Sequence, residues 1–274
     1  MGTFVTRREF LSRLGTAGAV VAIGGKVQAE TTKPYGGFQM GMQSYSLRAF
    51  PLEKAIEMVK ELGLHYLEAF PGHLPMNSSA EQRAKVLSLL KESDIRLVAW
   101  GVQGFGPNAE QNRAIFEFAR AMGIKTLSAD PSPDSFDILD KLVEEFSINI
   151  AIHPHGPGSR WARVEQIHNA IKDHHQRIGV CMDTGHLARA GEDNVQAVSV
   201  FKERLFGVHL KDVNEQKRDV PIGAGILDMP GFFKALKAIK FKGMVALEYE
   251  PEPNDPLPGI KQSLTFLRQM LKTV

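Results

Sequence analysis

Cysteine is almost absent from this sequence of 274 residues, which contains only Cys181. A single thiol cannot form an intrachain disulfide, and it excludes zinc sites that are built from several cysteines. Cys181 lies within an apolar run at residues 178–182. In that setting we expect a buried structural thiol rather than a nucleophile.

An excess of charge is also lacking, because 33 basic residues face 31 acidic residues and the formal net charge is +2. This balance predicts neither a nucleic-acid-binding surface nor strong attraction to an anionic membrane. Hydrophobic residues make up 43% of the chain and charged residues 23%. These proportions are typical of a globular protein with one large core.

The N-terminal 30 residues lack an apolar run long enough for a stable membrane span, and they resemble an export signal instead. Residues 6–11 read Thr-Arg-Arg-Glu-Phe-Leu, which is similar to the twin-arginine motif, and a glycine- and alanine-rich stretch follows at residues 14–25. Residues 27–29 offer a small-residue cleavage site. We therefore predict a leader at residues 1–30 and a periplasmic or otherwise exported protein. The alternative is an N-terminal tail in which the paired arginines are accidental.

Short apolar runs alternate with longer amphipathic segments beyond residue 33, which is typical of repeated βα units. Gly63 and Gly123 follow two of the amphipathic segments, where a helix would end before the next strand. No Gly-x-Gly-x-x-Gly follows the first predicted strand, which argues against an open dinucleotide-binding sheet. We predict an α/β protein whose residues 37–274 form a single-domain (β/α)8 TIM barrel. The expected strands are residues 38–45, 66–70, 97–101, 126–129, 148–153, 179–183, 206–210 and 244–248.

Metal-competent side chains stand at the ends of four consecutive predicted strands. They are His153, Asp183, His209 and Glu248. The carboxyl ends of barrel strands meet on one face, so these side chains should converge. Two imidazoles and two carboxylates suit one Mn, Co, Zn or Fe ion better than Ca²⁺ or Mg²⁺. Taken singly, each residue has another explanation: a structural histidine, a helix cap for Asp183, or a solvated pair of Glu248 with Glu250.

Further polar and aromatic side chains are expected at the same rim. Glu68 ends the second predicted strand, and we expect it to contact the substrate or to support the residues that do. The alternative for Glu68 is a helix-capping or surface role. Tyr45 and Trp100 fall at or just beyond strand ends, as do Phe70 and Phe105. Aromatic faces at these places suit a sugar ring, although ordinary packing explains each one equally well.

Several segments, in order along the chain, resemble the sugar phosphate isomerase/epimerase family with the xylose isomerase-like barrel. The segments are residues 41–48 (Gly-Met-Gln-Ser-Tyr-Ser-Leu-Arg), 182–187 (Met-Asp-Thr-Gly-His-Leu), 209–212 (His-Leu-Lys-Asp), 221–228 and 243–250. The resemblance covers about residue 37 to the C-terminus. It implies a TIM barrel in which a Glu, an Asp, a His and a second Glu hold a metal ion, and in which the two glutamates move protons on opposite faces of a substrate.

Three of these places are matched by Asp183, His209 and Glu248, whereas His153 stands where the family has its first glutamate. The resemblance further implies that His186 contacts or polarises the substrate and that Lys211 stabilises negative charge on an enediolate. His155 is expected to contact the substrate or support the site, or else to be a surface-loop histidine.

The replacement by His153 bears on the reaction. A metal-bound neutral imidazole cannot readily act as a second acid or base. An isomerase or epimerase with a metal-stabilised enediolate is the first prediction, and it would need His155, His186 or Glu68 as the proton partner of Glu248. A lyase or hydratase acting on 3-keto-glycosides or related oxidised sugars needs only one base, and Glu248 can serve.

Two other functions are weaker interpretations. An endonuclease IV-like enzyme would have further histidines on the second and third strands, where this chain has Glu68 and Trp100. A non-catalytic sugar-binding barrel would have lost its catalytic activity when His153 replaced the family's first glutamate. A small-molecule sugar is the expected partner. No glycine-rich phosphate cradle is evident, which favours an unphosphorylated sugar without deciding the question. Assembly into a homo-oligomer is also left open.

Overall fold

A computed structural model describes residues 34–274, and its centre is a closed barrel of eight parallel strands in the order β1-β10-β7-β6-β5-β4-β3-β2. The predicted (β/α)8 fold is confirmed, and each expected strand is present. Their bounds are β1 (Gln39–Gln43), β2 (Tyr66–Ala69), β3 (Arg96–Phe105), β4 (Thr126–Pro131), β5 (Asn149–Ile152), β6 (Ile178–Asp183), β7 (Leu205–Leu210) and β10 (Met244–Leu247). The predicted leader at residues 1–30 lies outside the described residues.

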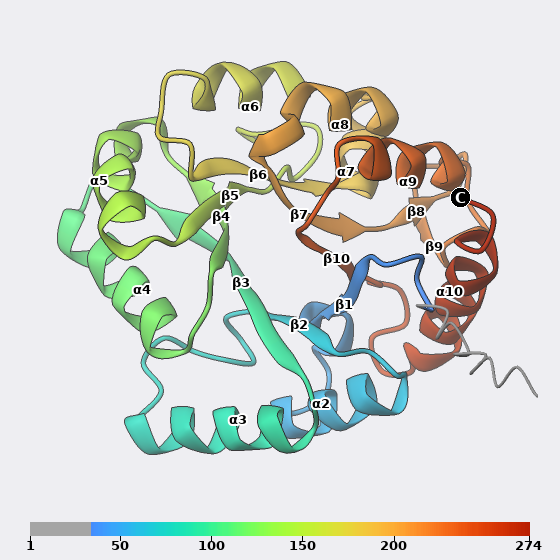
Figure 1. Cartoon of the computed structure of the whole chain (residues 1–274), viewed down its shortest axis with the longest axis horizontal. Helices are drawn as coiled ribbons and strands as arrows, with labels where there is room; N and C mark the ends of the chain where they lie inside the picture. The colour runs from blue at the N-terminus through green and yellow to red at the C-terminus, as the bar shows by residue number, and fades with distance from the viewer. Residues whose placement is uncertain (1–33) are drawn as a thin grey trace, which may run out of the picture. The chain divides into compact units, whose positions relative to one another are not determined.

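Helices surround the barrel strands (Figure 1). They are α2 (Leu52–Glu61), α3 (Ala80–Glu92), α4 (Ala109–Ala121), α5 (Phe136–Phe146), α6 (Val164–Ile171), α7 (Thr184–Arg189), α8 (Asn194–Phe201), α9 (Met229–Ala238) and α10 (Leu257–Met270), with short 3-10 helices η1 (Ser44–Leu47), η2 (Pro133–Ser135) and η3 (Lys202–Arg204). In α2, the residues Ala55, Ile56 and Val59 recur at three- and four-residue spacing and are fully buried. Gly63 follows this helix at φ +71°, the left-handed conformation that ends a helix at little cost in glycine.

A small antiparallel pair of strands, β8 (Asp212–Val213) and β9 (Asp219–Val220), extends from the rim after β7. Two-residue strands carry no periodic signal, so the sequence did not predict them. The Asp212 carboxylate accepts backbone N–H bonds from Val213, Gly223, Gly225 and Leu227. One side chain therefore fixes the loop that leads from β9 to α9.

Inside the barrel, a polar layer lies above a layer of small side chains. The strand register pairs Cys181 with Gly207 and Asp183 with His209, and alternate residues of a strand face the same side. Cys181 thus lies one layer below Asp183 as a buried free thiol, as the sequence predicted. The small residues leave room for imidazole and carboxylate side chains at the upper end of the barrel.

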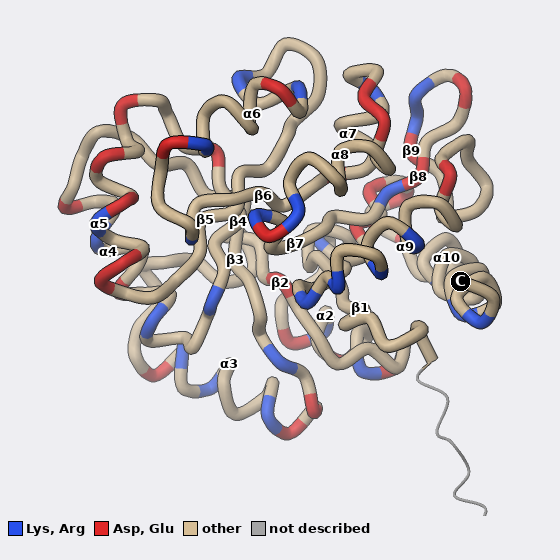
Figure 2. Tube along the Cα trace, turned by 45° about the horizontal axis from the view of Figure 1, so that its top comes forward, with Lys and Arg blue, Asp and Glu red and all other residues tan. Residues whose placement is uncertain are grey.

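Lysine and arginine are interspersed with aspartate and glutamate along the described chain (Figure 2). This distribution agrees with the balanced composition. Within residues 34–274, no helix combines the length and the apolar character needed to cross a membrane.

Candidate metal centre and active site

The four predicted ligands converge at the carboxyl end of the barrel. His153 follows β5, Asp183 ends β6, His209 lies in β7 and Glu248 follows β10. All four are buried, and each offers one donor atom within 4.8 Å of the others. Because β5, β6, β7 and β10 are neighbours in the barrel, residues up to 95 positions apart meet at one point.

Most donor atoms of this cluster have no hydrogen-bond partner among the described residues. Both ring nitrogens of His153 and of His209 are buried without a hydrogen bond, as are Asp183 Oδ2 and Glu248 Oε2, although ion-pair contacts of 3.0–3.4 Å reach most of these atoms. Leaving buried polar atoms unpaired costs about 1–3 kcal/mol each. A divalent cation would satisfy these atoms, and a mixed nitrogen and oxygen donor set is the kind that Zn²⁺, Mn²⁺, Fe²⁺ and Co²⁺ accept. The residues present therefore fit a metal ion.

The protonation states of three donors agree with this assignment. Burial lowers the pKa of His153 to about 3, despite the nearby Asp183, so its imidazole is neutral and has a free lone pair at neutral pH. Burial raises the pKa of Asp183 and Glu248, but Lys211 and nearby histidines outweigh it and hold both below their ordinary values. Both carboxylates are therefore ionised.

His209 differs from His153, because its surroundings favour the protonated ring. Burial lowers its pKa, but Cys181, Glu68 and Glu248 raise it well above the ordinary value. Ligation of a cation requires a neutral ring, so an ion must displace a proton from His209. Asp183 serves two purposes: its Oδ1 accepts the backbone N–H of His186 at 2.7 Å and caps α7, whereas Oδ2 faces the cluster. The two interpretations of Asp183 are thus compatible.

Lys211 is the buried cation of the site. Its Nζ lies 3.0 Å from Asp183 Oδ2 and 3.1 Å from Glu248 Oε2, and it donates a hydrogen bond to Glu250. Burial lowers the Lys211 pKa, but the three carboxylates raise it well above the ordinary value. One ammonium among three carboxylates leaves two negative charges uncompensated, which a divalent ion would neutralise.

A cavity of about 350 Å³ opens directly above the cluster. The residues that line it are Gln43, Tyr45, Phe70, Pro71, Gly101, Val102, His153, His155, His186, Lys211, Glu248 and Glu250. The predicted site residues Tyr45, His155, His186 and Lys211 are therefore brought together with two of the ligands. Gln43 was not predicted as a site residue, although it lies within the motif at residues 41–48. Gln43 Nε2 donates to Gly101 O, and Gln43 Oε1 accepts the backbone N–H of Tyr45, so Gln43 holds these two parts of the cavity lining together.

Two predicted substrate residues do not reach this cavity. Trp100 is 1% exposed, donates its indole N–H to Leu74 O and packs against Phe118 of α4. Its neighbour Ala99 clusters with Ala246 instead, because successive residues of a strand face opposite sides. Glu68 is 2% exposed and does face the barrel interior, but it lies against His209 rather than in the cavity lining.

The tautomer of His186 follows from its neighbour Arg189. Arg189 Nη1 lies 3.4 Å from His186 Nδ1, and a guanidinium can only donate. Arg189 is held in turn by Asp219. Burial lowers the His186 pKa, so the ring is neutral with its proton on Nε2. A cavity-lining imidazole in this state is suited to donate a hydrogen bond.

The aromatic side of the cavity packs against the half-buried His73. The ring of Phe70 lies edge-on to Tyr45 at 5.4 Å and 4.5 Å from the ring of His73. His73 Nε2 lies 2.9 Å from Phe50 O, which ties together the loops after β1 and β2. Burial lowers the pKa of His73.

We expect His73 to make folding stability depend on pH. The pKa of His73 is depressed in the folded protein and is about 6.5 in the unfolded chain. The stabilisation of the fold by neutral His73 is therefore complete above pH 6.5. It is lost at lower pH, because the unfolded chain then takes up a proton that the folded protein does not. A His73→Gln variant should lose less stability than the wild type between about pH 7.5 and 5.5, measured as urea midpoints. Equal pH dependence in the variant and the wild type would refute the assignment.

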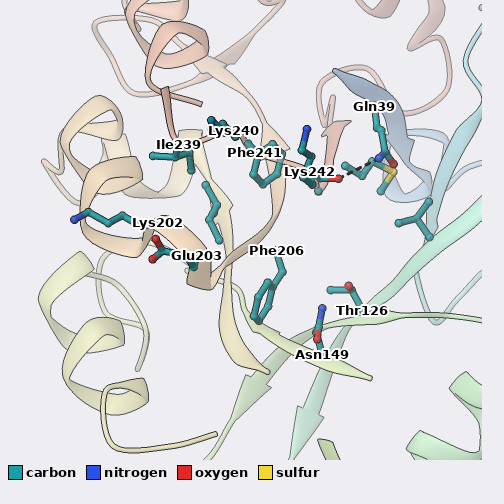
Figure 3. A pocket seen from close by; sticks show the side chains of 14 residues that line it. Gln39, Thr126, Asn149, Lys202, Glu203, Phe206, Ile239, Lys240, Phe241 and Lys242 are labelled. Atoms are coloured by element: carbon teal, nitrogen blue, oxygen red, sulfur yellow. Dashed lines mark hydrogen bonds between the residues drawn. The ribbon is translucent and has the colours of Figure 1, made fainter. Parts of the chain in front are cut away.

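A second cavity, of about 430 Å³, opens at the opposite end of the barrel, where the strands begin (Figure 3). Lys202, Lys240 and Lys242 lie around it, and Gln39 bonds the backbone of Lys242. The lysines are exposed, and the metal-competent clusters of the described residues lie elsewhere. In barrel enzymes the opposite face carries the chemistry, so we assign the site to the cavity above the four ligands.

Comparisons with known proteins agree with the fold. The family model described as the xylose isomerase-like TIM barrel matches residues 51–270. An inosose dehydratase of Geobacillus thermodenitrificans is 24% identical over 92% of this chain and 85% of its own length. Among solved structures, the IolI protein with a binding zinc atom has a TM-score of 0.74 at 18% identity, covering 86% of this chain and 98% of its own. The 3-keto-D-glucoside 4-epimerase of E. coli has a TM-score of 0.69 at 19% identity, covering 85% of this chain and 99% of its own.

Proposed function

Because this chain belongs to the xylose isomerase-like TIM barrel family, we propose that it is a metal-dependent enzyme that removes a proton next to the carbonyl of an uncharged sugar-like ketone. The observation that carries the proposal is the convergence of buried donor atoms of His153, Asp183, His209 and Glu248 that make no hydrogen bond, beside the 350 Å³ cavity. A divalent ion held by these four residues would stabilise negative charge that develops on the carbonyl oxygen.

Glu248 is the proposed base. It combines an ionised carboxylate with a place in the cavity lining, and the Lys211 ammonium beside it adds a positive charge that stabilises an enolate. In the proton-abstraction step, the C–H electron pair becomes the carbon–carbon double bond of the enolate, and the proton goes to Glu248.

Elimination is the reaction that this arrangement supports best. The enolate electrons reform the carbonyl and expel the substituent on the next carbon, which accepts a hydrogen bond from His186 Nε2–H, takes the proton held by Glu248 and leaves as water or as an alcohol. The product is an unsaturated ketone. This sequence needs one base and one hydrogen-bond donor, and the site supplies both. The similarity to an inosose dehydratase over 92% of the chain favours the same class.

Epimerisation is the second candidate, and the histidine side of the cavity favours it. The rings of His155 and His186 lie 5.8 Å apart and both line the cavity. Either ring, once protonated from solvent, could return a proton to the enolate in place of Glu248, and delivery to the opposite face would invert the carbon. The family's first glutamate would do this, but His153 takes its place in the cluster.

The charges around the cavity support an unphosphorylated substrate. Lys211 is the one lysine or arginine in the lining formed by the described residues, and three carboxylates already surround it. No free cation is therefore offered there to a phosphate. Tyr45 and Phe70 supply apolar faces for a ring.

The test is incubation of the metal-loaded enzyme in D2O with inosose, 3-keto-glycosides and ketoses. We expect loss of water or release of the aglycone, together with deuterium at the carbon next to the carbonyl in recovered substrate. Deuterium uptake with inversion at the carbon next to the carbonyl, without loss of water or release of the aglycone, would favour epimerisation. Absence of deuterium uptake from the whole panel would refute both reactions.

We also propose export through the twin-arginine route, on the strength of residues 6–11 and 27–29. Export of a folded protein would let the metal be acquired before transport. Replacing Arg7 and Arg8 together by lysine should move the protein from the periplasmic to the cytoplasmic fraction of a bacterial host. An unchanged distribution would contradict the proposal.

A further inference from the structure

Glu68 is a buried carboxylate that the proposed reaction does not use. It lies on β2, with β1 and β10 between it and β7 in the barrel order, and its side chain is 3% exposed. Its Oε2 lies 3.0 Å from His209 Nε2, whereas Oε1 has no hydrogen-bond partner among residues 34–274. Burial of a carboxylate is costly unless another group compensates for it, so its contact with His209 calls for an explanation.

Both nitrogens of His209 face carboxylates. Nδ1 lies 3.2 Å from Glu248 Oε2, and Nε2 lies 3.0 Å from Glu68 Oε2. Turning the ring over would place carbon atoms against both carboxylates, so these contacts fix the orientation of the ring. The Nε2 contact is at hydrogen-bond distance, but its angle lies outside hydrogen-bond geometry.

We propose that Glu68 is a positioning residue that accepts a hydrogen bond from His209 Nε2–H and thereby presents the Nδ1 lone pair to the metal. The inference rests on the proposed metal centre and extends it. A carboxylate behind a ligating imidazole fixes its tautomer and orientation and raises its basicity. Glu68 thus acts through His209 and not through the substrate, which agrees with its place outside the cavity lining.

An alternative is a second ion between Glu68, Cys181 and His209, whose donor atoms also lie within 4.8 Å of one another. The structure favours the hydrogen bond. Glu68 and Cys181 are both absent from the lining of the cavity above them, so an ion there would have no direct route from solvent. The alternative remains measurable as a second equivalent of metal that depends on Cys181.

The test is zinc affinity, measured by competition with a chromophoric chelator. Glu68→Gln should bind one Zn²⁺ about 10- to 100-fold more weakly than the wild type, and Glu68→Asp should recover part of the loss. Cys181→Ser is the matched control in the same layer and should keep the wild-type affinity. Wild-type affinity in Glu68→Gln would overturn the proposal, as would a second equivalent lost in Cys181→Ser.

A second measurement can be decided on the wild type alone. In the zinc-loaded wild type, ¹⁵N-resolved spectra should show a proton on His209 Nε2 with a strongly downfield shift, and this signal should move upfield in Glu68→Gln. A proton on Nδ1 would overturn the assignment even if the variant failed to fold. If the wild type binds no zinc at all, the metal centre itself fails; if wild type and Glu68→Gln bind equally well, only the role of Glu68 fails.

Discussion

A Glu248→Gln variant is expected to lose about 10²- to 10⁴-fold in kcat, because the amide cannot accept the proton that the carboxylate removes. It should also lose solvent deuterium exchange into the substrate. Glutamine keeps the size of the side chain and one oxygen that faces the cluster. The measurement is kcat together with deuterium incorporation, with the metal content of each sample determined in parallel.

The matched control for this substitution is Glu252→Gln. Glu252 stands on the same loop, four residues further on, and is exposed. It should retain wild-type turnover. Deuterium exchange at the wild-type rate in fully metal-loaded Glu248→Gln would show that another group removes the proton, and Glu250 would then be the first candidate because it also lines the cavity.

A Lys211→Met variant is expected to have the largest effect on stability. Lys211 lies between Asp183, Glu248 and Glu250, so its removal leaves three neighbouring carboxylates without their cation. Breaking a buried ion pair from one side costs about 3–5 kcal/mol. For a domain of this size, each kcal/mol corresponds to about 2–4 °C in Tm, so the metal-free variant should melt roughly 6–20 °C below the metal-free wild type.

Metal should reverse part of this loss, because a divalent ion supplies the positive charge that the variant lacks. We expect Zn²⁺ to raise the Tm of Lys211→Met more than that of the wild type. Lys85→Met is the control: Lys85 pairs with Glu53 at 3.3 Å on the surface, where such pairs contribute about 0–1 kcal/mol. If metal-free Lys211→Met had the same Tm as the metal-free wild type, the charge balance described for the site would be wrong.

The fold and most of the metal cluster could be predicted from the sequence for one physical reason. Buried parallel strands are short apolar runs, and each ends where polar side chains become tolerable. His153, Asp183 and His209 stand at such ends, so the barrel topology alone brings them together. The prediction of the barrel and the resemblance to its family both depend on these apolar runs that end in polar side chains.

What could not be predicted is the direction of single side chains. Trp100 and Ala99 are adjacent, and the register of β3 decides which of them faces the barrel interior; a shift of one residue exchanges them. Glu68 faces inward as expected, but its depth relative to His209 depends on the stagger between strands. Gln43 carries no chemical signal in the sequence, and only its contacts with Gly101 and Tyr45 assign it to the cavity.

The central claim is that His153, Asp183, His209 and Glu248 hold one divalent ion. The most direct measurement is a crystal structure of the zinc-loaded protein with anomalous data collected above and below the zinc edge. We predict one anomalous peak per chain, within bonding distance of all four side chains and with Nδ1 as the donor of His209. An absence of any peak at this cluster in protein that contains stoichiometric zinc would contradict the account.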